Sequence, residues 1–158
     1  MKSTAVLVLA LAAGLAPQAI AADFVCPDLA QAVQVAACPT DEELRYTFTG
    51  FCSDNNRSYK GDTDVCTDFE RYRTLKNLAL WESGDGNFSA YVSCDRPPGE
   101  VKAMRVNGVR IARQGRINVL ICSYGEGVSF SYRTRAECRI SAAAACSGDA
   151  STCKAHCD

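Results

Sequence analysis

Few residues in this chain of 158 could perform acid–base or nucleophilic chemistry. The chain has one histidine, His156, so a site built from two histidines is excluded by number. A Ser-His-Asp triad would require this histidine to reach a buried serine from a cysteine-rich tail, which the sequence does not favour. Paired carboxylates of the glycosidase kind stay open as an alternative, with Glu82, Asp85 and Asp95 near predicted strand ends as candidates. We expect no catalytic residues.

Ten cysteines form the second chemically capable group. An even number in an exported chain predicts a disulfide framework, and the sequence leaves the pairing open. A cysteine nucleophile would need a free thiol with a lowered pKa, which an even number argues against. The spacing of Cys146, Cys153, His156 and Cys157 matches no tight zinc knuckle, so we expect disulfides there, no metal site and no cofactor. The predicted disulfide cysteines are Cys26, Cys38, Cys52, Cys66, Cys94, Cys122, Cys138, Cys146, Cys153 and Cys157.

A polar loop, CSDNNRSYKGDTDVC, runs between the third and fourth cysteines. It is not an EF-hand, because Tyr59 and Val65 stand where the loop would need glycine and a bidentate glutamate. A looser oxygen site and an adhesive Lys-Gly-Asp triplet at 60–62 stay open, and a disulfide-closed surface turn is favoured over both. The candidate binding residues of this loop are Asp54, Asn56, Lys60 and Asp62.

Two glycosylation sequons, Asn56-Arg57-Ser58 and Asn87-Phe88-Ser89, fall in predicted turns. In a eukaryotic host, both positions would be accessible to a transferase. We therefore predict N-glycosylation at Asn56 and Asn87 for such a host.

Charge is unevenly spread along the chain, although the net charge is −1. Residues 22–69 hold nine acids and three bases, and residues 100–139 hold three acids and eight bases. Part of the basic group is predicted to lie on one hairpin and the turn after it, where it could bind an anionic glycan or an acidic protein. Aromatic residues are not interleaved there, which argues against nucleic acid. These candidate binding residues are Lys102, Arg105, Arg110, Arg113 and Arg116.

The first 21 residues have the pattern of a secretory signal. One lysine precedes an apolar run from Ala5 to Leu15, and Ala19-Ile20-Ala21 supplies the small–x–small pattern of a cleavage site. No later segment has the ~20 apolar residues of a membrane span. We expect a signal peptide at 1–21 and one exported domain at 22–158, without membrane contact. Its location would be extracellular or, in a bacterium, periplasmic.

Short alternating segments separated by turn residues predict the fold of this domain. Asn107-Gly108 is the strongest two-residue hairpin signal, because both central residues need positive φ. Trp81 is expected in the core. The expected fold is α+β, a disulfide-rich antiparallel meander of about six or seven strands with two or three short helices. Strands are predicted at 44–51, 78–83, 87–94, 101–106, 109–114, 117–124 and 128–134, and helices at 27–36, 67–77 and 149–156.

The signal peptide, the ten cysteines, and the segments NLALWESGDGNFSAYVSC and VLICSYGEGVSFSYRTRAEC together resemble the small secreted cysteine-rich proteins of filamentous fungi. Many of those proteins are effectors deployed on hosts. The resemblance is at class level and carries over no functional residues. It implies a secreted, non-enzymatic binding protein acting on a host or extracellular protein or glycan. The alternatives are a periplasmic or secreted inhibitor or immunity protein, and a small secreted hydrolase with paired carboxylates.

Overall fold

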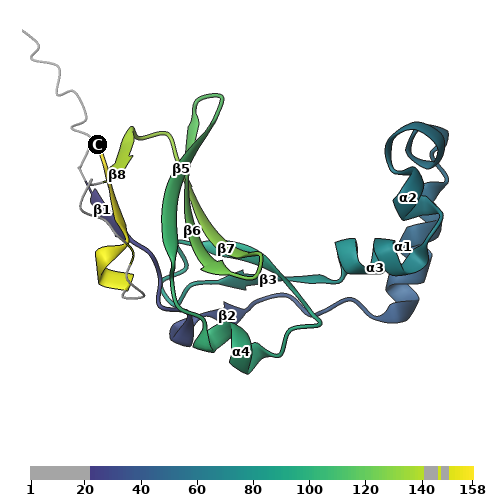
Figure 1. The fold of residues 1–158 in the computed structure, drawn as a ribbon, viewed down its shortest axis with the longest axis horizontal. Coiled ribbons are helices and arrows are strands. Elements are labelled where there is room, and N and C mark those ends of the chain that lie inside the picture. Colours follow the sequence, from purple (N-terminus) through teal and green to yellow (C-terminus); the bar gives the residue numbers. More distant parts are fainter. Residues whose placement is uncertain (1–21, 141–145, 147–149) are drawn as a thin grey trace, which may run out of the picture.

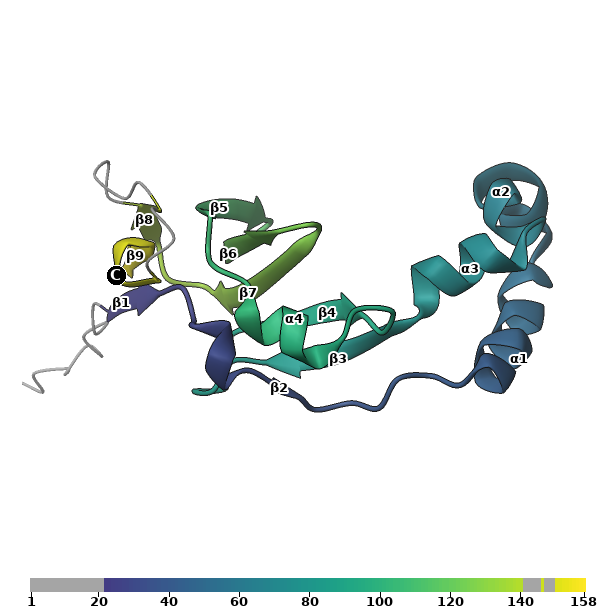
Figure 2. The same ribbon diagram turned by 60° about the horizontal axis from the view of Figure 1, so that its bottom comes forward.

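The computed structural model describes residues 22–140, 146 and 150–158. The predicted signal peptide lies outside these residues. In the described part of the chain, no helix has the length and apolar character needed to cross a membrane. The protein has three parts, namely a six-stranded sheet, a three-stranded sheet formed by the two ends of the described chain, and a helical arm (residues 40–77) that projects away from both (Figures 1 and 2).

The six-stranded sheet is antiparallel and confirms the α+β, disulfide-rich class. Five of its strands lie where alternation predicted them, because valine, isoleucine, leucine and aromatic residues recur at every second position. Gly115, at a φ of 62°, supplies the tight turn between the strands at 108–114 and 117–125. In spatial order the strands are β2 (Val33–Gln34), β3 (Leu78–Glu82), β4 (Ser89–Ser93), β7 (Val128–Thr134), β6 (Ile117–Gly125) and β5 (Gly108–Gln114).

The smaller sheet joins the two ends of the described chain. Its strands are β1 (Ala22–Val25), β9 (Lys154–Cys157) and β8 (Cys138–Ile140), with β9 in the middle. The helix predicted at 149–156 is therefore wrong over most of its length. A short 3₁₀ turn, η3 (Ala150–Thr152), comes first, and β9 follows because it can pair with a strand on each side. Residue 149 lies outside the described residues.

The helical arm contains α1 (Asp41–Cys52), a π-helical turn η2 (Arg57–Gly61), α2 (Thr63–Cys66) and α3 (Phe69–Lys76). The strand predicted at 44–51 is wrong, since this segment is α1. Thr40 and Glu43 form a capping box at its start, with the Glu43 amide donating to the Thr40 hydroxyl and the Glu43 carboxylate accepting from the Thr40 amide. The helix predicted to end near Asn77 is confirmed as α3, although its N-cap is Asp68 rather than Thr67.

Three further predictions are corrected by the structure. The strand predicted at 101–106 is wrong, because α4 (Pro98–Ala103), which has proline in its first turn, covers residues 101–103, and residues 104–106 form no strand. The helix predicted at 27–36 is reduced to a 3₁₀ turn, η1 (Leu29–Gln31), followed by β2. Asn107-Gly108 makes no hairpin, because the Asn107 amide donates to the carbonyl of Ser123 and Gly108 begins β5.

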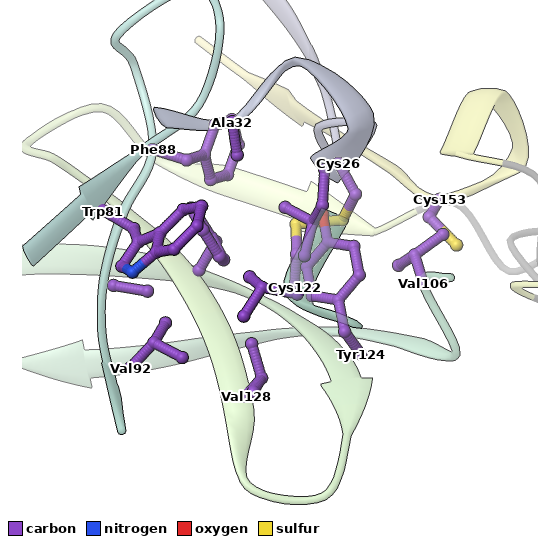
Figure 3. Packing of buried hydrophobic residues seen from close by; sticks show 14 of the residues in the cluster. Cys26, Ala32, Trp81, Phe88, Val92, Val106, Cys122, Tyr124, Val128 and Cys153 are labelled. Carbon is purple, nitrogen blue, oxygen red and sulfur yellow. A yellow bond between two sulfur atoms is a disulfide. The ribbon is translucent and has the colours of Figure 1, made fainter. Parts of the chain in front are cut away.

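The main core lies on one face of the six-stranded sheet, beneath η1 and α4 and beside the smaller sheet (Figure 3). Trp81 is 3% exposed and belongs to this core, as predicted. Phe88 and Phe130 are also buried there, and Phe24 of β1 stacks on Tyr132 of β7 at 4.3 Å between ring centroids. These contacts attach the smaller sheet to the larger one.

All ten cysteines are paired in five disulfides, as the even number predicted. Cys26–Cys122 is buried in the main core and is drawn in Figure 3. The other four bridges hold the smaller parts of the fold, and each joins segments that contact one another. They are Cys38–Cys94 at the base of the arm, Cys52–Cys66 within the arm, Cys138–Cys157 within the smaller sheet, and Cys146–Cys153 beside η3.

Candidate interaction surface on the helical arm

The arm has its own small aromatic core between α1 and α3. Leu44 and Phe48 lie one helical turn apart and face α3. The Phe48 ring contacts Phe69 at 5.6 Å and Tyr72 at 5.2 Å between centroids, and Phe51 contacts Tyr72 at 5.5 Å. Only Leu44 and Tyr72 of the arm's apolar side chains are as little as 3% exposed, so this core is thin.

Cationic side chains cover the outside of this aromatic core. The Arg45 guanidinium lies 4.3 Å from the centroid of Phe69, and the Arg57 guanidinium lies 4.2 Å from that of Phe51. Lys76 approaches Phe51 from α3 at 5.2 Å. Cations placed this way add about 0.5–1 kcal/mol each at exposed sites, and their stems shield apolar surface. They therefore stabilise a unit that buries few side chains.

A polar cluster fixes the base of the arm to the sheet. The Arg73 guanidinium of α3 donates to the Asp95 carboxylate at 3.0 Å and to Asp41 at 3.4 Å. The buried Asn77 amide donates to the same Asp95 carboxylate at 3.0 Å. The hydrogen bond from Arg73 is the main reason why the pKa of the Asp95 carboxyl lies below its usual value. With the nearby Cys38–Cys94 bridge, this cluster joins the base of the arm to the end of β4.

The polar loop of the sequence forms the tip of the arm, and the Cys52–Cys66 bridge closes it as the surface-turn interpretation expected. It is helical rather than extended, since η2 and α2 lie within it. The Arg57 guanidinium lies between the carboxylates of Asp54 and Asp62, at 3.9 Å from each, so a cationic side chain occupies the space between two candidate oxygen ligands. Asn56 and Lys60 are exposed beside them.

The adhesive triplet at 60–62 is not presented as an extended loop. Lys60 and Gly61 end η2, and the Asp62 amide donates to the carbonyl of Arg57 at 2.7 Å. Over the described residues, no three His, Cys, Asp or Glu side chains are grouped so that they could hold a metal ion. The four candidate binding residues all lie at the arm tip, where Asp54, Asn56 and Lys60 are exposed and Asp62 is half-buried, and their binding role stays a prediction.

Two large exposed tyrosines and an exposed leucine stand out on the arm. Tyr46 on α1 is 82% exposed, Tyr59 on η2 is 78% exposed, and Leu75 on α3 is 46% exposed. The sequence analysis names none of the three as a binding residue, and for Tyr46 the reason is that 44–51 reads as a strand. Once Leu44 and Phe48 are recognised as one helical face, the same spacing places Tyr46 on the opposite side.

Two open hollows flank α1 and meet at Thr47 and Phe51, which line both. One has a volume of about 760 Å³ and lies between α1, α3 and the segment leading to the arm. The second, about 600 Å³, runs along the outer side of α1 past Tyr46 and Gly50. A Cβ atom added at Gly50 would meet no atom within 4 Å, which confirms the open space.

The predicted basic hairpin is not formed, and its five residues are spread over several elements. Lys102 lies on α4, Arg105 follows it, and Arg116 lies in the β5–β6 turn. Arg110 and Arg113 are both on β5 but an odd number of positions apart, so they face opposite sides of the sheet. Two of the charges are neutralised locally, by the ion pairs Arg105–Asp28 at 3.5 Å and Arg113–Glu137 at 2.7 Å.

Two of the carboxylates proposed for hydrolysis, Asp85 and Asp95, do not form a facing pair. Asp85 and Asp95 lie before and after β4, at its opposite ends. Asp85 accepts hydrogen bonds from Ser83 and Asn87, and the bond from Ser83 is the main cause of its lowered pKa. A general acid needs a raised pKa, whereas Asp85 and Asp95 both have lowered ones. Glu82 ends β3 and pairs across the sheet with Ser89.

The single histidine joins the two ends of the described chain. His156 of β9 places Nδ1 2.8 Å from an Asp23 oxygen and Nε2 2.8 Å from an Asp158 oxygen. Both ring nitrogens are therefore occupied, and neither is free to activate a serine. The hydrogen bond with Asp23 is the main reason why the pKa of His156 is raised.

Both predicted glycosylation sites are exposed. Asn56 lies at the start of η2 on the arm tip. Asn87 lies in the β3–β4 turn, where its side-chain amide donates to Asp85 at 2.8 Å. The two sites remain predictions, and a glycan on Asn56 would cover part of the arm tip.

Comparison with known proteins finds no match: no family model, no curated protein and no solved structure is significantly similar to the chain.

Proposed function

We propose that the mature chain is an exported, non-enzymatic binding protein that docks on a protein partner through its helical arm. The observation that carries this proposal is the pair of tyrosines, Tyr46 and Tyr59, that stand more than three-quarters exposed on a projecting, disulfide-closed arm. The resemblance to secreted cysteine-rich effectors points in the same direction.

Exposed tyrosines suit this role for a physical reason. Tyrosine brings a large amphipathic surface into an interface and loses few rotatable bonds when it is fixed, so it is enriched among residues that dominate binding energy. The arm is also already ordered by the Cys52–Cys66 bridge and by the Arg73–Asp95 pair. A pre-ordered surface avoids the entropy loss of folding on contact, and binding is correspondingly stronger.

The hollows beside α1 supply the complementary shape. An interface needs pockets into which a partner's side chains can be inserted and desolvated. The hollow along the outer side of α1 lies directly beside Tyr46, and the larger one carries the apolar surfaces of Leu44 and Phe51 between Glu43 and Lys76. This combination of apolar floor and charged rim is the anatomy of a protein–protein contact.

The test uses the three most exposed tyrosines as matched positions. A photo-crosslinking amino acid replaces Tyr46, Tyr59 or Tyr91 in the purified mature protein, which is then added to the extracellular fluid of its natural setting. Tyr91 lies on the sheet and is 71% exposed, so it controls for exposure alone. We expect one discrete adduct from the two arm positions and none from Tyr91.

Competition completes this experiment. An excess of the unmodified protein, added as a competitor, should abolish the adduct. The same excess of the Tyr46→Ala/Tyr59→Ala variant should leave the adduct in place. Equal labelling from Tyr91, or no adduct from either arm position, would contradict the proposal. Should the partner be an enzyme that the protein inhibits one to one, the inhibitor alternative is the correct form of this function. Turnover of a glycan or RNA substrate that is lost in Glu82→Gln or Asp95→Asn would contradict a binding function and support the hydrolase alternative.

A further inference from the structure

The face of the six-stranded sheet opposite the main core carries a separate group of charges. Strand register defines this face, because residues directly opposite each other in neighbouring strands point the same way. Arg110 of β5 pairs with Ile121 of β6, which pairs with Ser131 of β7. Arg133 lies two residues beyond Ser131 and so shares its face. Arg110 and Arg133 therefore lie on the same side of the sheet, on strands that flank β6.

Two more arginines lie at the adjoining edge of this sheet. Asn118, at the start of β6, pairs with Arg113 on one side and Thr134 on the other, so the β5–β6 turn and the end of β7 are neighbours. Arg116 lies in that turn, and Arg135 directly follows β7. We call Arg110, Arg116, Arg133 and Arg135 the arginine surface. All four are exposed.

The arginine surface is not neutralised by the protein itself. Over residues 22–140, 146 and 150–158, none of the four has a carboxylate within salt-bridge distance. The acid nearest in sequence, Glu137, pairs with Arg113 instead. Glu82 shares the same cross-strand row as Arg110 but lies four strands away, on β3. Four guanidinium groups are thus left with unused hydrogen-bond donors at one edge of an exposed face.

The surroundings of these arginines are serine hydroxyls and one narrow aliphatic row on β6. Serines occupy the neighbouring positions of β4 and β7, at Ser89, Ser129 and Ser131, and the Ser131 hydroxyl donates to the carbonyl of Ser89. On β6, between the arginine-bearing strands, Val119 is 3% exposed, Ile121 is half-buried and Ile117 is 36% exposed. This single row of mostly covered aliphatic side chains is narrower than the apolar centre that a protein interface needs. The face offers guanidinium and hydroxyl groups instead.

We propose that the arginine surface binds an anionic polysaccharide, with guanidinium groups on its carboxylates or sulfates and serine hydroxyls on its sugar hydroxyls. Guanidinium forks match planar carboxylates and sulfate oxygens with two parallel hydrogen bonds. Nucleic acid is the less suitable polyanion, because no aromatic residue lies among the four arginines to stack on bases. The whole chain has a net charge of −1, so attraction must arise at this surface and not from the molecule's overall field.

This site lies on different residues from the arm and does not depend on the proposed protein partner. Its test measures the affinity of the purified mature protein for heparin, which is sulfated, and for polygalacturonate, which is carboxylated, at increasing salt. We expect saturable binding to at least one of them. The Arg110→Gln/Arg133→Gln variant should lose about tenfold in affinity for each arginine removed, because each charge-assisted contact contributes about 1.5 kcal/mol or more.

The control has the same change of charge outside the surface. Arg113→Gln/Arg139→Gln also removes two positive charges, but these two arginines are paired with Glu137 and Asp158. We expect this variant to keep most of its affinity for the polysaccharide. Its affinity should also lose less of its salt dependence than that of the Arg110→Gln/Arg133→Gln variant. Three results would overturn the proposal: no binding to either polysaccharide at low salt, an equal loss in the control, or tighter binding to duplex DNA that the same surface variant abolishes. Unchanged thermal midpoints in all variants would show that each one is folded.

Discussion

Removal of the Cys52–Cys66 disulfide should loosen the helical arm while both sheets keep their stability. The bridge closes a loop of sequence separation 14, and the loss of chain entropy in the unfolded state corresponds to about 3 kcal/mol for a loop of this size. Against this, the arm fully buries only two apolar side chains, Leu44 and Tyr72. The bridge is therefore a large share of the arm's local stability.

Hydrogen–deuterium exchange with mass spectrometry measures this directly. In the Cys52→Ser/Cys66→Ser variant, amides of α1 and α3 should exchange about 100-fold faster, since every 1.4 kcal/mol is a factor of ten. Amides of β6 and β7 should exchange at their original rates. Cys138→Ser/Cys157→Ser is the matched control, because it removes a bridge of similar size from the smaller sheet. Its sequence separation of 19 corresponds to an entropic contribution of about 3.3 kcal/mol. Unchanged exchange in α1 and α3, or equal acceleration in β6 and β7, would refute the arm as a separate unit.

Three further predictions concern the sheets. The NMR titration of His156, the one histidine of the chain, should give a pKa above 6.5 that falls toward 6.5 in Asp23→Asn; an unchanged pKa in the variant would show that Asp23 is not the cause. The pKa of His156 is raised in the folded state and that of Asp23 is lowered, so their pairing stabilises the fold below pH 6.5. This stabilisation is lost as the pH rises through the folded pKa of His156. It is also lost as the pH falls through the folded pKa of Asp23. Phe130→Ala should lower the free energy of unfolding, measured in urea, by about 3–5 kcal/mol, whereas Tyr91→Ala should change it by less than about 0.5 kcal/mol. Similar losses in the two variants would contradict the assignment of Phe130 to the core face of the six-stranded sheet and of Tyr91 to its exposed face. Gly115→Ala should cost about 1–2 kcal/mol in the same assay because of its φ of 62°, and a neutral result would mean that the turn relaxes.

Five strands of the six-stranded sheet could be predicted because their alternation of apolar and polar residues is local. The helix α1 could not, because its sequence shows the same alternation. In α1, Tyr46 and Phe48 alternate with Thr47 and Thr49, which reads as a strand rich in β-branched and aromatic residues. The same letters place Leu44 and Phe48 four apart, which is also the spacing of one helical face. The capping box at Thr40 decides between these periods, and this start signal was overlooked.

The smaller sheet and the arginine surface depend on contacts that no local pattern contains. β1 and β9 are separated by most of the chain and become strands only because they pair with each other. The arginine surface likewise joins residues of β5 and β7 through β6, so the sequence grouped Arg110 and Arg116 with the wrong neighbours and omitted Arg133. The pairing of the cysteines is similarly a consequence of the fold, so the sequence leaves it open.

The distribution of the disulfides also indicates how the proposed docking of the arm would depend on its surroundings. Cys26 and Cys122 are 1% and 0% exposed, so a reductant reaches their bridge only when the main core opens. Cys52 and Cys66 are both partly exposed on the arm, and their bridge can be attacked in the folded protein. A mildly reducing compartment would therefore loosen the arm tip while the six-stranded sheet stays folded. The proposed docking through the arm would then be lost, and the proposed polysaccharide binding through the arginine surface would persist, so only the first of these proposals requires an oxidising environment.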